Sequence, residues 1–299
     1  MTRRHLTSRQ LETFTTVAKL GSFTRAAEAL HLTQPAVSIQ IRQIADFVGL
    51  PLFEQTGRDI RLTAAGQELL QTARELDDSW SRFDSSIDAL KGLKRGRLRV
   101  ALVTTAKYFL PRMLGAFCQR YPEIEIELEV ANRARIVERL RANEDDLFIM
   151  SYPPEELDVV TTPFLDNPLV VIAPVDYPLP AGRLNLADLV PHPFLLRETG
   201  SGTRKAVDRH LAGLGLSLKI KLALGSNEAI RDLVASGMGL AILSRHVLGK
   251  HPEDEGLRIL DVAGFPLQQP WSVVHLRNKI LSLPAHAFIE ELVSVKAGP

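Results

Sequence analysis

An unbroken heptad repeat between residues 69 and 90 limits what this chain can fold into more than any other feature of its sequence. Apolar side chains recur there at alternating spacings of four and three residues, with polar groups between them. The repeat consists of Leu69, Ala73, Leu76, Trp80, Phe83, Ile87 and Leu90. So narrow a stripe predicts a long helix, about 64–93, that pairs with another helix. Packing on the body of the same chain is the alternative, but a seam placed between two domains favours dimerisation.

The residues before the repeat predict a helix-turn-helix. A first helical pattern is followed by Ser22, which stands where the N-cap of a second helix, 23–30, belongs. Thr33 precedes a third helix, in whose first turn Pro35 costs no hydrogen bond. Two short helices joined by a tight turn form this motif.

The N-terminal part is also the basic part of the chain. Eight basic and five acidic side chains give residues 1–65 a net charge of +3, and the whole-chain charge of +1 leaves −2 for the rest. This asymmetry favours a polyanion partner for the first part, although a difference of three charges also arises by chance.

The third helix has two different faces. The inward stripe would be Val37, Ile41, Ile44 and Val48. The opposite side and its flanks hold Pro35, Ser38, Ile39, Arg42, Gln43 and Asp46. Arg and Gln contact bases or phosphates, and an exposed Ile39 suits a thymine methyl group. This outward face favours a DNA-recognition helix over an ordinary solvated helix.

A short β-hairpin is expected after the third helix. Apolar residues at 52–53 and at 60 and 62 flank a Thr-Gly-Arg-Asp turn. Such a hairpin is a wing, on which Arg58 and Arg61 would meet phosphates or a minor groove. Without the neighbouring helices, two ordinary surface arginines explain the pattern equally well.

Beyond a glycine-flanked hinge at 92–96, strand and helix patterns alternate to the C-terminus. The expected strands are 97–103, 125–130, 146–150, 168–174, 193–197, 219–224, 240–243 and 271–276. The expected helices are 108–121, 133–142, 203–214, 227–236 and 285–295. This alternation predicts two βαβ sets with parallel sheets and right-handed crossovers.

Small and polar residues follow five of these strands, at 104–107, 131–133, 150–152, 198–204 and 225–228. Open α/β sheets bind ligands there, in front of helix N-termini. The two glycines and the Ser/Thr residues of 198–204 can form an anion cradle. Each residue alone serves equally well as a helix cap, but the set predicts a binding crevice. Lys107, Arg133, Arg197 and Arg204 would make this crevice favour an anion.

Several classes of function find no support in the sequence. It has no Walker A motif, no H-E-x-x-H motif and no complete dinucleotide fingerprint, so we expect no catalytic residues, no metal and no cofactor. The single cysteine, Cys118, excludes an intramolecular disulfide, and its place beside Phe117 in a helix predicts burial. No apolar run reaches a membrane-spanning length and the start of the chain lacks an apolar core, so we expect a cytoplasmic protein.

Two groups of segments carry a resemblance to a known family. Residues 23–38, 52–54 and 62–66 resemble the LysR-type transcriptional regulators. Residues 96–109, 114–118, 129–133, 145–150 and 167–171 resemble the subgroup of Calvin-cycle (RuBisCO operon) regulators of CbbR type. The resemblance implies an α/β chain with a winged-helix N-terminal domain, a dimerising linker helix and a periplasmic-binding-protein-like domain of two Rossmann-like subdomains.

The same resemblance implies boundaries and sites. The domains would span 1–65, 66–94 and 95–299, with subdomain I at about 97–166 and 268–299 and subdomain II at about 167–267. The DNA-binding residues would be Gln34, Pro35, Ser38, Ile39 and Arg42, with Arg58 and Arg61 on the wing. The effector-binding residues would be Thr104, Thr105, Lys107, Asn132, Thr203 and Asn227.

The implied partners are promoter DNA, further copies of the chain in a homodimer or homotetramer, RNA polymerase, and a small anionic effector. That effector would be a sugar phosphate, phosphoenolpyruvate, phosphoglycolate or NADPH. Regulation of aromatic catabolism or nitrogen assimilation stays open within the family. Outside it, a solute-binding α/β protein is the alternative.

Overall fold

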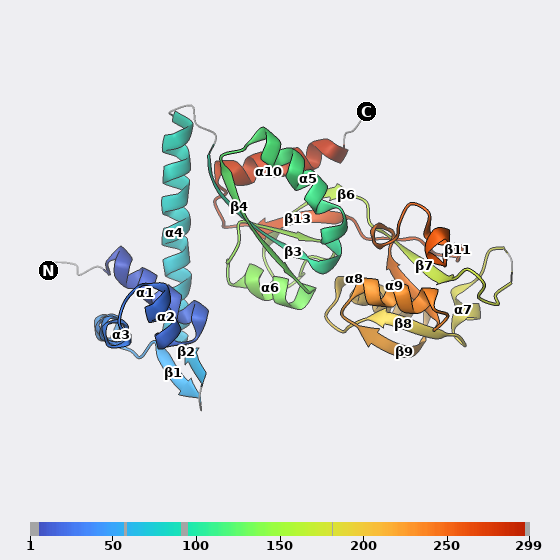
Figure 1. The fold of residues 1–299 in the computed structure, drawn as a ribbon, viewed down its shortest axis with the longest axis horizontal. Helices are drawn as coiled ribbons and strands as arrows, with labels where there is room; N and C mark the ends of the chain where they lie inside the picture. Colours follow the sequence, from blue (N-terminus) through green and yellow to red (C-terminus); the bar gives the residue numbers. More distant parts are fainter. Residues whose placement is uncertain (1–5, 57–58, 91–94, 181, 297–299) are drawn as a thin grey trace. The chain divides into compact units, whose positions relative to one another are not determined.

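The structure is a computed structural model that describes residues 6–56, 59–90, 95–180 and 182–296. It divides into two compact units, residues 1–83 and 84–299, which are described in turn (Figure 1). The wing-tip Arg58 and most of the expected hinge at 92–96 lie outside the described residues. Across the described ranges, every helix is too short or too polar to cross a bilayer.

The first unit is a winged helix-turn-helix, as the sequence predicts. Its elements are α1 (Ser8–Leu20), α2 (Phe23–Ala29), α3 (Gln34–Val48) and the antiparallel hairpin of β1 (Phe53–Thr56) and β2 (Asp59–Leu62). Ser22 and Thr33 cap α2 and α3 by accepting backbone N–H groups at 3.3 and 3.4 Å. Phe14, Val37 and Ile44 are fully buried between the three helices.

The long helix α4 (Ala64–Leu90) follows the hairpin. Its third residue, Gly66, packs so closely on the preceding loop that a Cβ would lie 2.1 Å from the carbonyl oxygen of Leu52. A larger residue would therefore separate the start of α4 from the winged domain.

The second unit contains two sheets. The first has the strand order β4-β3-β5-β13-β6. Its strands are β3 (Gly96–Val103), β4 (Ile124–Ala131), β5 (Leu147–Met150), β6 (Val159–Leu165) and β13 (Trp271–Leu276). The associated helices are η1 (Thr104–Tyr108), α5 (Leu110–Arg120), α6 (Arg133–Arg141) and α10 (Leu283–Lys296).

The second sheet has the order β11-β7-β10-β8-β9, with β12 pairing to β7. Its strands are β7 (Pro168–Pro174), β8 (Pro193–Arg197), β9 (Lys219–Leu224), β10 (Leu240–Ser244), β11 (Leu257–Leu260) and β12 (Leu267–Gln268). Its helices are α7 (Leu186–Leu189), α8 (Gly202–Leu214), α9 (Asn227–Ala235), η2 (Arg245–Val247) and η3 (Pro252–Glu255).

Both sheets are mixed, so the expectation of purely parallel sheets is wrong. Strand β13 runs antiparallel to β5 and β6, and β7 runs antiparallel to β10 and β11. The reason is that the chain passes between the two sheets twice, from β6 to β7 and from β12 to β13. Strands β7 and β13, with which the chain enters the other sheet, do not follow βαβ crossovers. They therefore run antiparallel to their neighbours.

The expected burial of Cys118 is also wrong, because its side chain is exposed. Helix α5 buries Leu110, Leu114 and Phe117, which lie on one face at helical spacing. Cys118 follows Phe117 and is rotated about 100° away from that face.

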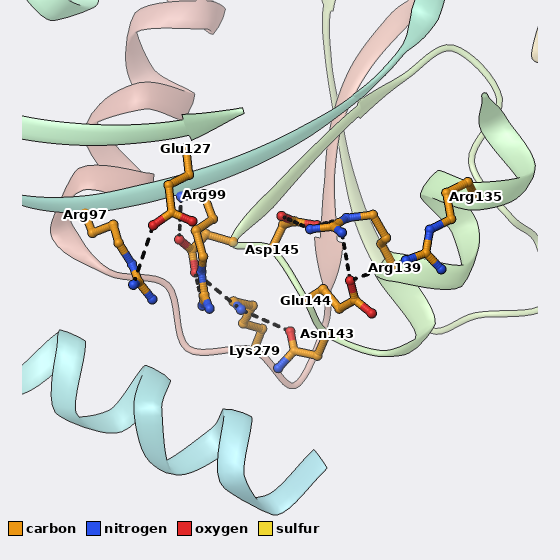
Figure 2. Close-up of polar contacts among 10 residues, drawn as sticks. Arg97, Arg99, Glu127, Arg135, Arg139, Asn143, Glu144, Asp145 and Lys279 are labelled. Carbon is orange, nitrogen blue, oxygen red and sulfur yellow. Dashed lines mark hydrogen bonds and ion pairs between the residues drawn. The ribbon is translucent and has the colours of Figure 1, made fainter. Parts of the chain in front are cut away.

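A polar network closes the edge of the first sheet where its parallel strands begin (Figure 2). Arg99 and Lys279 contact the Asp146 carboxylate at 3.1 and 3.4 Å, and Arg139 pairs with Asp145 at 2.8 Å. Burial alone would raise the pKa of Asp146, but the two cations hold that pKa below its ordinary value. The residues predicted to bind a ligand follow the opposite, carboxyl ends of these strands.

Candidate functional site

A cleft lies between the two sheets of the second unit, at the carboxyl ends of β3, β5 and β8. Its lining is Val103, Thr104, Thr105, Arg133, Ser151, Arg197, Ser201, Gly202, Thr203 and Trp271. Helices α6 and α8 begin at Arg133 and Gly202, so two helix N-termini face this space. Parallel strands followed by helices produce such a crevice, and its helix dipoles favour negative charge.

Three of the expected effector residues, Thr104, Thr105 and Thr203, line the cleft. Thr105 belongs to a buried network that joins the two sheets. The guanidinium of Arg197 donates through Nη1 to Thr105 Oγ1 at 3.3 Å and to Asn227 Oδ1 at 2.7 Å. Asn227 Nδ2 donates to the same Thr105 oxygen at 3.2 Å. Asn227 does not line the cleft. Its hydrogen bond orients Arg197, which lines the cleft.

The network leaves one hydrogen of Thr105 for a ligand. A threonine hydroxyl has two acceptor positions and one donor hydrogen. Arg197 and Asn227 occupy both acceptor positions. The hydroxyl can then bond further only as a donor, so it suits an acceptor such as a carboxylate or phosphate oxygen.

Lys107 does not line the cleft, and its ammonium group pairs with Glu228 at 2.7 Å. The hydrogen bond from Lys107 lowers the pKa of Glu228 to about 2, so this carboxylate is ionised at neutral pH. Since Lys107 follows β3 and Glu228 lies in α9, the contact links the two halves of the unit. Binding of an effector by Lys107 stays a prediction.

Asn132 likewise lies beside the cleft rather than in it. Its side-chain oxygen accepts the Arg135 backbone N–H at 3.0 Å and so caps α6. The next residue, Arg133, reaches the cleft. The cap thus fixes the start of the helix that presents Arg133.

Several lining residues were not among the expected effector contacts. Arg133 and Arg197 were expected to supply charge, and Ser151 and Ser201 lie in segments already expected to follow strands. Trp271 was not expected at all, because it begins the returning strand β13, whose place beside β5 cannot be read from local sequence. Arg204 lies apart from the lining, and its guanidinium pairs with Asp208 at 2.8 Å.

The outward face of α3 is available for contact in the first unit. Ile39 is 56% exposed, and Gln34, Pro35 and Arg42 are exposed beside it. Ser38 is half-buried and accepts a hydrogen bond from Gln34 at 2.9 Å. Arg61 is exposed on β2. The helix therefore has the two faces predicted from its sequence, and the contacts of the outward face with DNA stay a prediction.

The heptad seam on α4 is largely uncovered in the single chain. Ala73 is buried and Leu69 and Ile87 are half-buried. The larger members are exposed, namely Leu76 at 45%, Trp80 at 62%, Phe83 at 54% and Leu90 at 84%. Trp80 and Phe83 pack edge to face on one another, with ring centroids 5.9 Å apart. A contiguous apolar stripe of this kind needs a partner surface.

Within the described ranges, no cluster of His, Cys, Asp and Glu side chains could hold a metal ion.

Two family models match the chain. The model of the "Bacterial regulatory helix-turn-helix protein, lysR family" matches residues 8–67. The model of the "LysR substrate binding domain" matches residues 91–297, which include the whole cleft.

Individual proteins give the same result. A RuBisCO operon transcriptional regulator of Acidithiobacillus ferrooxidans is 45% identical over 298 residues, which are 99% of this chain and 96% of that protein. The CcmR regulatory domain of Synechocystis PCC6803, solved in complex with 2-PG, is 46% identical with a TM-score of 0.65, covering 68% of this chain and 98% of that domain. A full-length OxyR variant from Pseudomonas aeruginosa shares the fold, with a TM-score of 0.74 and 24% identity over 99% of this chain and 96% of its own.

Proposed function

The chain belongs to the LysR family of transcriptional regulators, and from this premise we propose that it controls a carbon-fixation operon in response to a phosphorylated anion. As a member of this family it is a DNA-binding regulator with an effector-binding domain and not an enzyme. The regulon, the effector and the residues that bind each partner are our proposals.

Similar proteins support the proposed regulon. A protein that is 45% identical over nearly the whole chain is named a regulator of the RuBisCO operon. The CcmR regulatory domain, which is 46% identical to the matching part of this chain, was solved with 2-PG. We read 2-PG as 2-phosphoglycolate. We therefore propose 2-phosphoglycolate or a similar phosphorylated carboxylate as the effector of this chain.

The observation that carries the proposal is the donor character of the cleft. Two helix N-termini, the guanidinium groups of Arg133 and Arg197, and the remaining hydrogen of Thr105 all offer positive potential or N–H and O–H donors. Glu198 pairs with Arg197 at 2.8 Å and offsets part of that charge. The two guanidinium groups and the two helix N-termini still suit a ligand rich in oxygen acceptors.

The remaining parts of the function follow the family pattern. We propose that Gln34, Pro35, Ser38, Ile39 and Arg42 contact bases or phosphates in a major groove, with Arg58 and Arg61 on the flanking backbone. The α4 seam would pair two copies, and two such dimers would form a tetramer on the promoter. Contact with RNA polymerase, a cytoplasmic location and the domain boundaries at 65 and 94 belong to the same proposal.

Calorimetric titration of the full-length protein tests the effector. The ligands are 2-phosphoglycolate, phosphoenolpyruvate, a sugar phosphate and NADPH, with glycolate as the unphosphorylated control. We expect saturable binding of a phosphorylated anion and at least tenfold weaker binding of glycolate. Binding of none of these anions, or of an apolar compound instead, would overturn the effector class.

A further inference from the structure

Two side chains that line the cleft carry buried N–H groups without a hydrogen-bond partner in the described part of the chain. These groups are Nη2 of Arg133 and Nε1 of Trp271. Buried polar groups in proteins are nearly always paired, because losing water without gaining a partner is unfavourable. Two residues of the cleft lining therefore each have a donor that no acceptor of the described chain satisfies.

Arg133 is held in place by its other contacts. Its Nε donates to the carbonyl oxygen of Tyr152 at 2.7 Å, and its guanidinium lies 5.6 Å from the centroid of the Tyr152 ring. No carboxylate of the described chain forms an ion pair with Arg133. Arg197 differs, because Glu198, Asn227 and Thr105 occupy its guanidinium. Of these two arginines, Arg133 is therefore the one with an unpaired N–H donor, at Nη2.

Burial makes it unfavourable for the Arg133 guanidinium to lack an anionic partner. Desolvation lowers the pKa of Arg133, with weaker opposing effects from Glu156 and Tyr152. An anionic ligand would restore the lost solvation. An anion that pairs with Arg133 therefore gains binding free energy by removing this desolvation penalty.

Trp271 is fixed as firmly as Arg133. Its side chain is 1% exposed, and its ring packs on Phe109 with centroids 5.0 Å apart. The indole N–H is a donor only and cannot serve a cation or a donor group on a ligand. The only hydrogen bond that this group can form is therefore with an acceptor atom, such as an oxygen of a ligand.

The start of α8 lies against the same residues from the opposite sheet. A Cβ placed on Gly202 would lie 3.6 Å from Arg133 Cδ and 3.7 Å from Ser151 Oγ. The N-terminus of a 13-residue helix and the Arg133 guanidinium thus adjoin one part of the cleft. That combination suits a phosphate, since guanidinium groups and helix N-termini both bind phosphate oxygens.

We propose that Arg133 and Trp271 form the subsite that binds the phosphate of the effector and rejects ligands without an oxyanion at that position. This assignment rests on the proposed effector function of the cleft. Trp271 and Arg133 are then specificity-determining residues, while the Thr105–Arg197–Asn227 network meets the other end of the ligand.

The test is calorimetric titration of full-length protein with 2-phosphoglycolate, comparing wild type with Trp271→Phe and Arg133→Gln. Trp271→Phe keeps an aromatic ring and removes the N–H, so we expect about tenfold weaker binding. Arg133→Gln removes a charged donor, so we expect a loss of about a hundredfold, and a smaller loss for glycolate. The matched control is Arg135→Gln on the same helix, whose guanidinium pairs with Glu138 at 3.1 Å outside the cleft.

Thermal unfolding separates ligand binding from a structural role. Trp271 is fully buried, so the smaller ring of Trp271→Phe leaves a cavity and should lower the unfolding temperature without ligand. The readout for the subsite is the rise in unfolding temperature on adding 2-phosphoglycolate, which should shrink in Trp271→Phe and Arg133→Gln but not in Arg135→Gln. If Trp271→Phe and Arg133→Gln bind the ligand within twofold of wild type, the subsite is refuted while the effector cleft stands. If wild type itself binds no phosphorylated anion, both proposals fall.

Discussion

A charged side chain in the α4 seam should dissociate the proposed dimer into single chains. Trp80 is 62% exposed and Phe83 54% exposed in the single chain. A large aromatic side chain buries up to about 250 Å², so Trp80 leaves roughly 150 Å² for a partner. At about 25 cal/mol per Å², two copies of Trp80 would contribute up to about 7 kcal/mol to a symmetric seam.

Ordering of the helices offsets part of this gain. We therefore expect Trp80→Asp to cost at least about 3 kcal/mol, which is more than a hundredfold in the dimer Kd. The desolvation of the new carboxylate adds to that cost. The double variant Trp80→Asp/Phe83→Asp should dissociate further.

Light scattering at a fixed protein concentration measures the effect. The double variant should have the mass of a smaller species than wild type and should lose operator binding. Ser79→Asp is the matched control, because it adds the same charge to an exposed position outside the heptad. A double variant that keeps the wild-type mass would show that the seam packs within one chain.

Three further outcomes are expected. Arg42→Ala should cost about 1–3 kcal/mol at one operator position, whereas Arg61→Ala should weaken binding evenly and flatten the salt dependence; unchanged footprints for both would remove α3 and β2 from the DNA interface. Lys107→Met should weaken 2-phosphoglycolate binding by about tenfold if Lys107 contacts the effector as the sequence predicts, and an affinity within threefold of wild type in calorimetry would show that Lys107 serves only its ion pair with Glu228. Asp146→Asn should lower the free energy of unfolding by about 3 kcal/mol at neutral pH. Since Arg99 and Lys279 lower the pKa of Asp146, this difference should hold above the ordinary carboxyl range and vanish as pH falls through the lowered pKa; a pH-independent difference in denaturant unfolding would contradict it.

The sequence predicts most strands of this fold but not their directions. Strands β7, β8, β9 and β13 have the predicted bounds. Strands β7 and β8 are apolar runs after a proline or turn residue, whereas β9 alternates Lys219 and Lys221 with apolar residues. Strand β6 was not predicted, because it lies at the sheet edge, is half-buried and contains Pro163, which removes a ladder donor. The direction of β13 depends on the double passage between sheets, which local sequence does not encode.

The candidate site shows the same division. Thr104, Thr105 and Thr203 were placed correctly at the cleft, because they follow strands that run to one edge. Lys107 and Asn227 also follow strands, but they do not line the cleft, and their side chains are engaged by Glu228 and by Arg197. Those partners are distant in sequence. Trp271 joins the cleft through tertiary packing alone, so no sequence pattern could have indicated it.

Hydroxyl-radical footprinting of the full-length protein on the promoter of a RuBisCO operon, with and without 2-phosphoglycolate, tests the central claim most directly. We predict protection that falls steeply in affinity as salt rises. The ligand should change the protected pattern or the DNA bend more than the affinity, because effector and DNA bind different domains. A footprint that no phosphorylated anion alters, or the absence of binding to this promoter, would contradict the account.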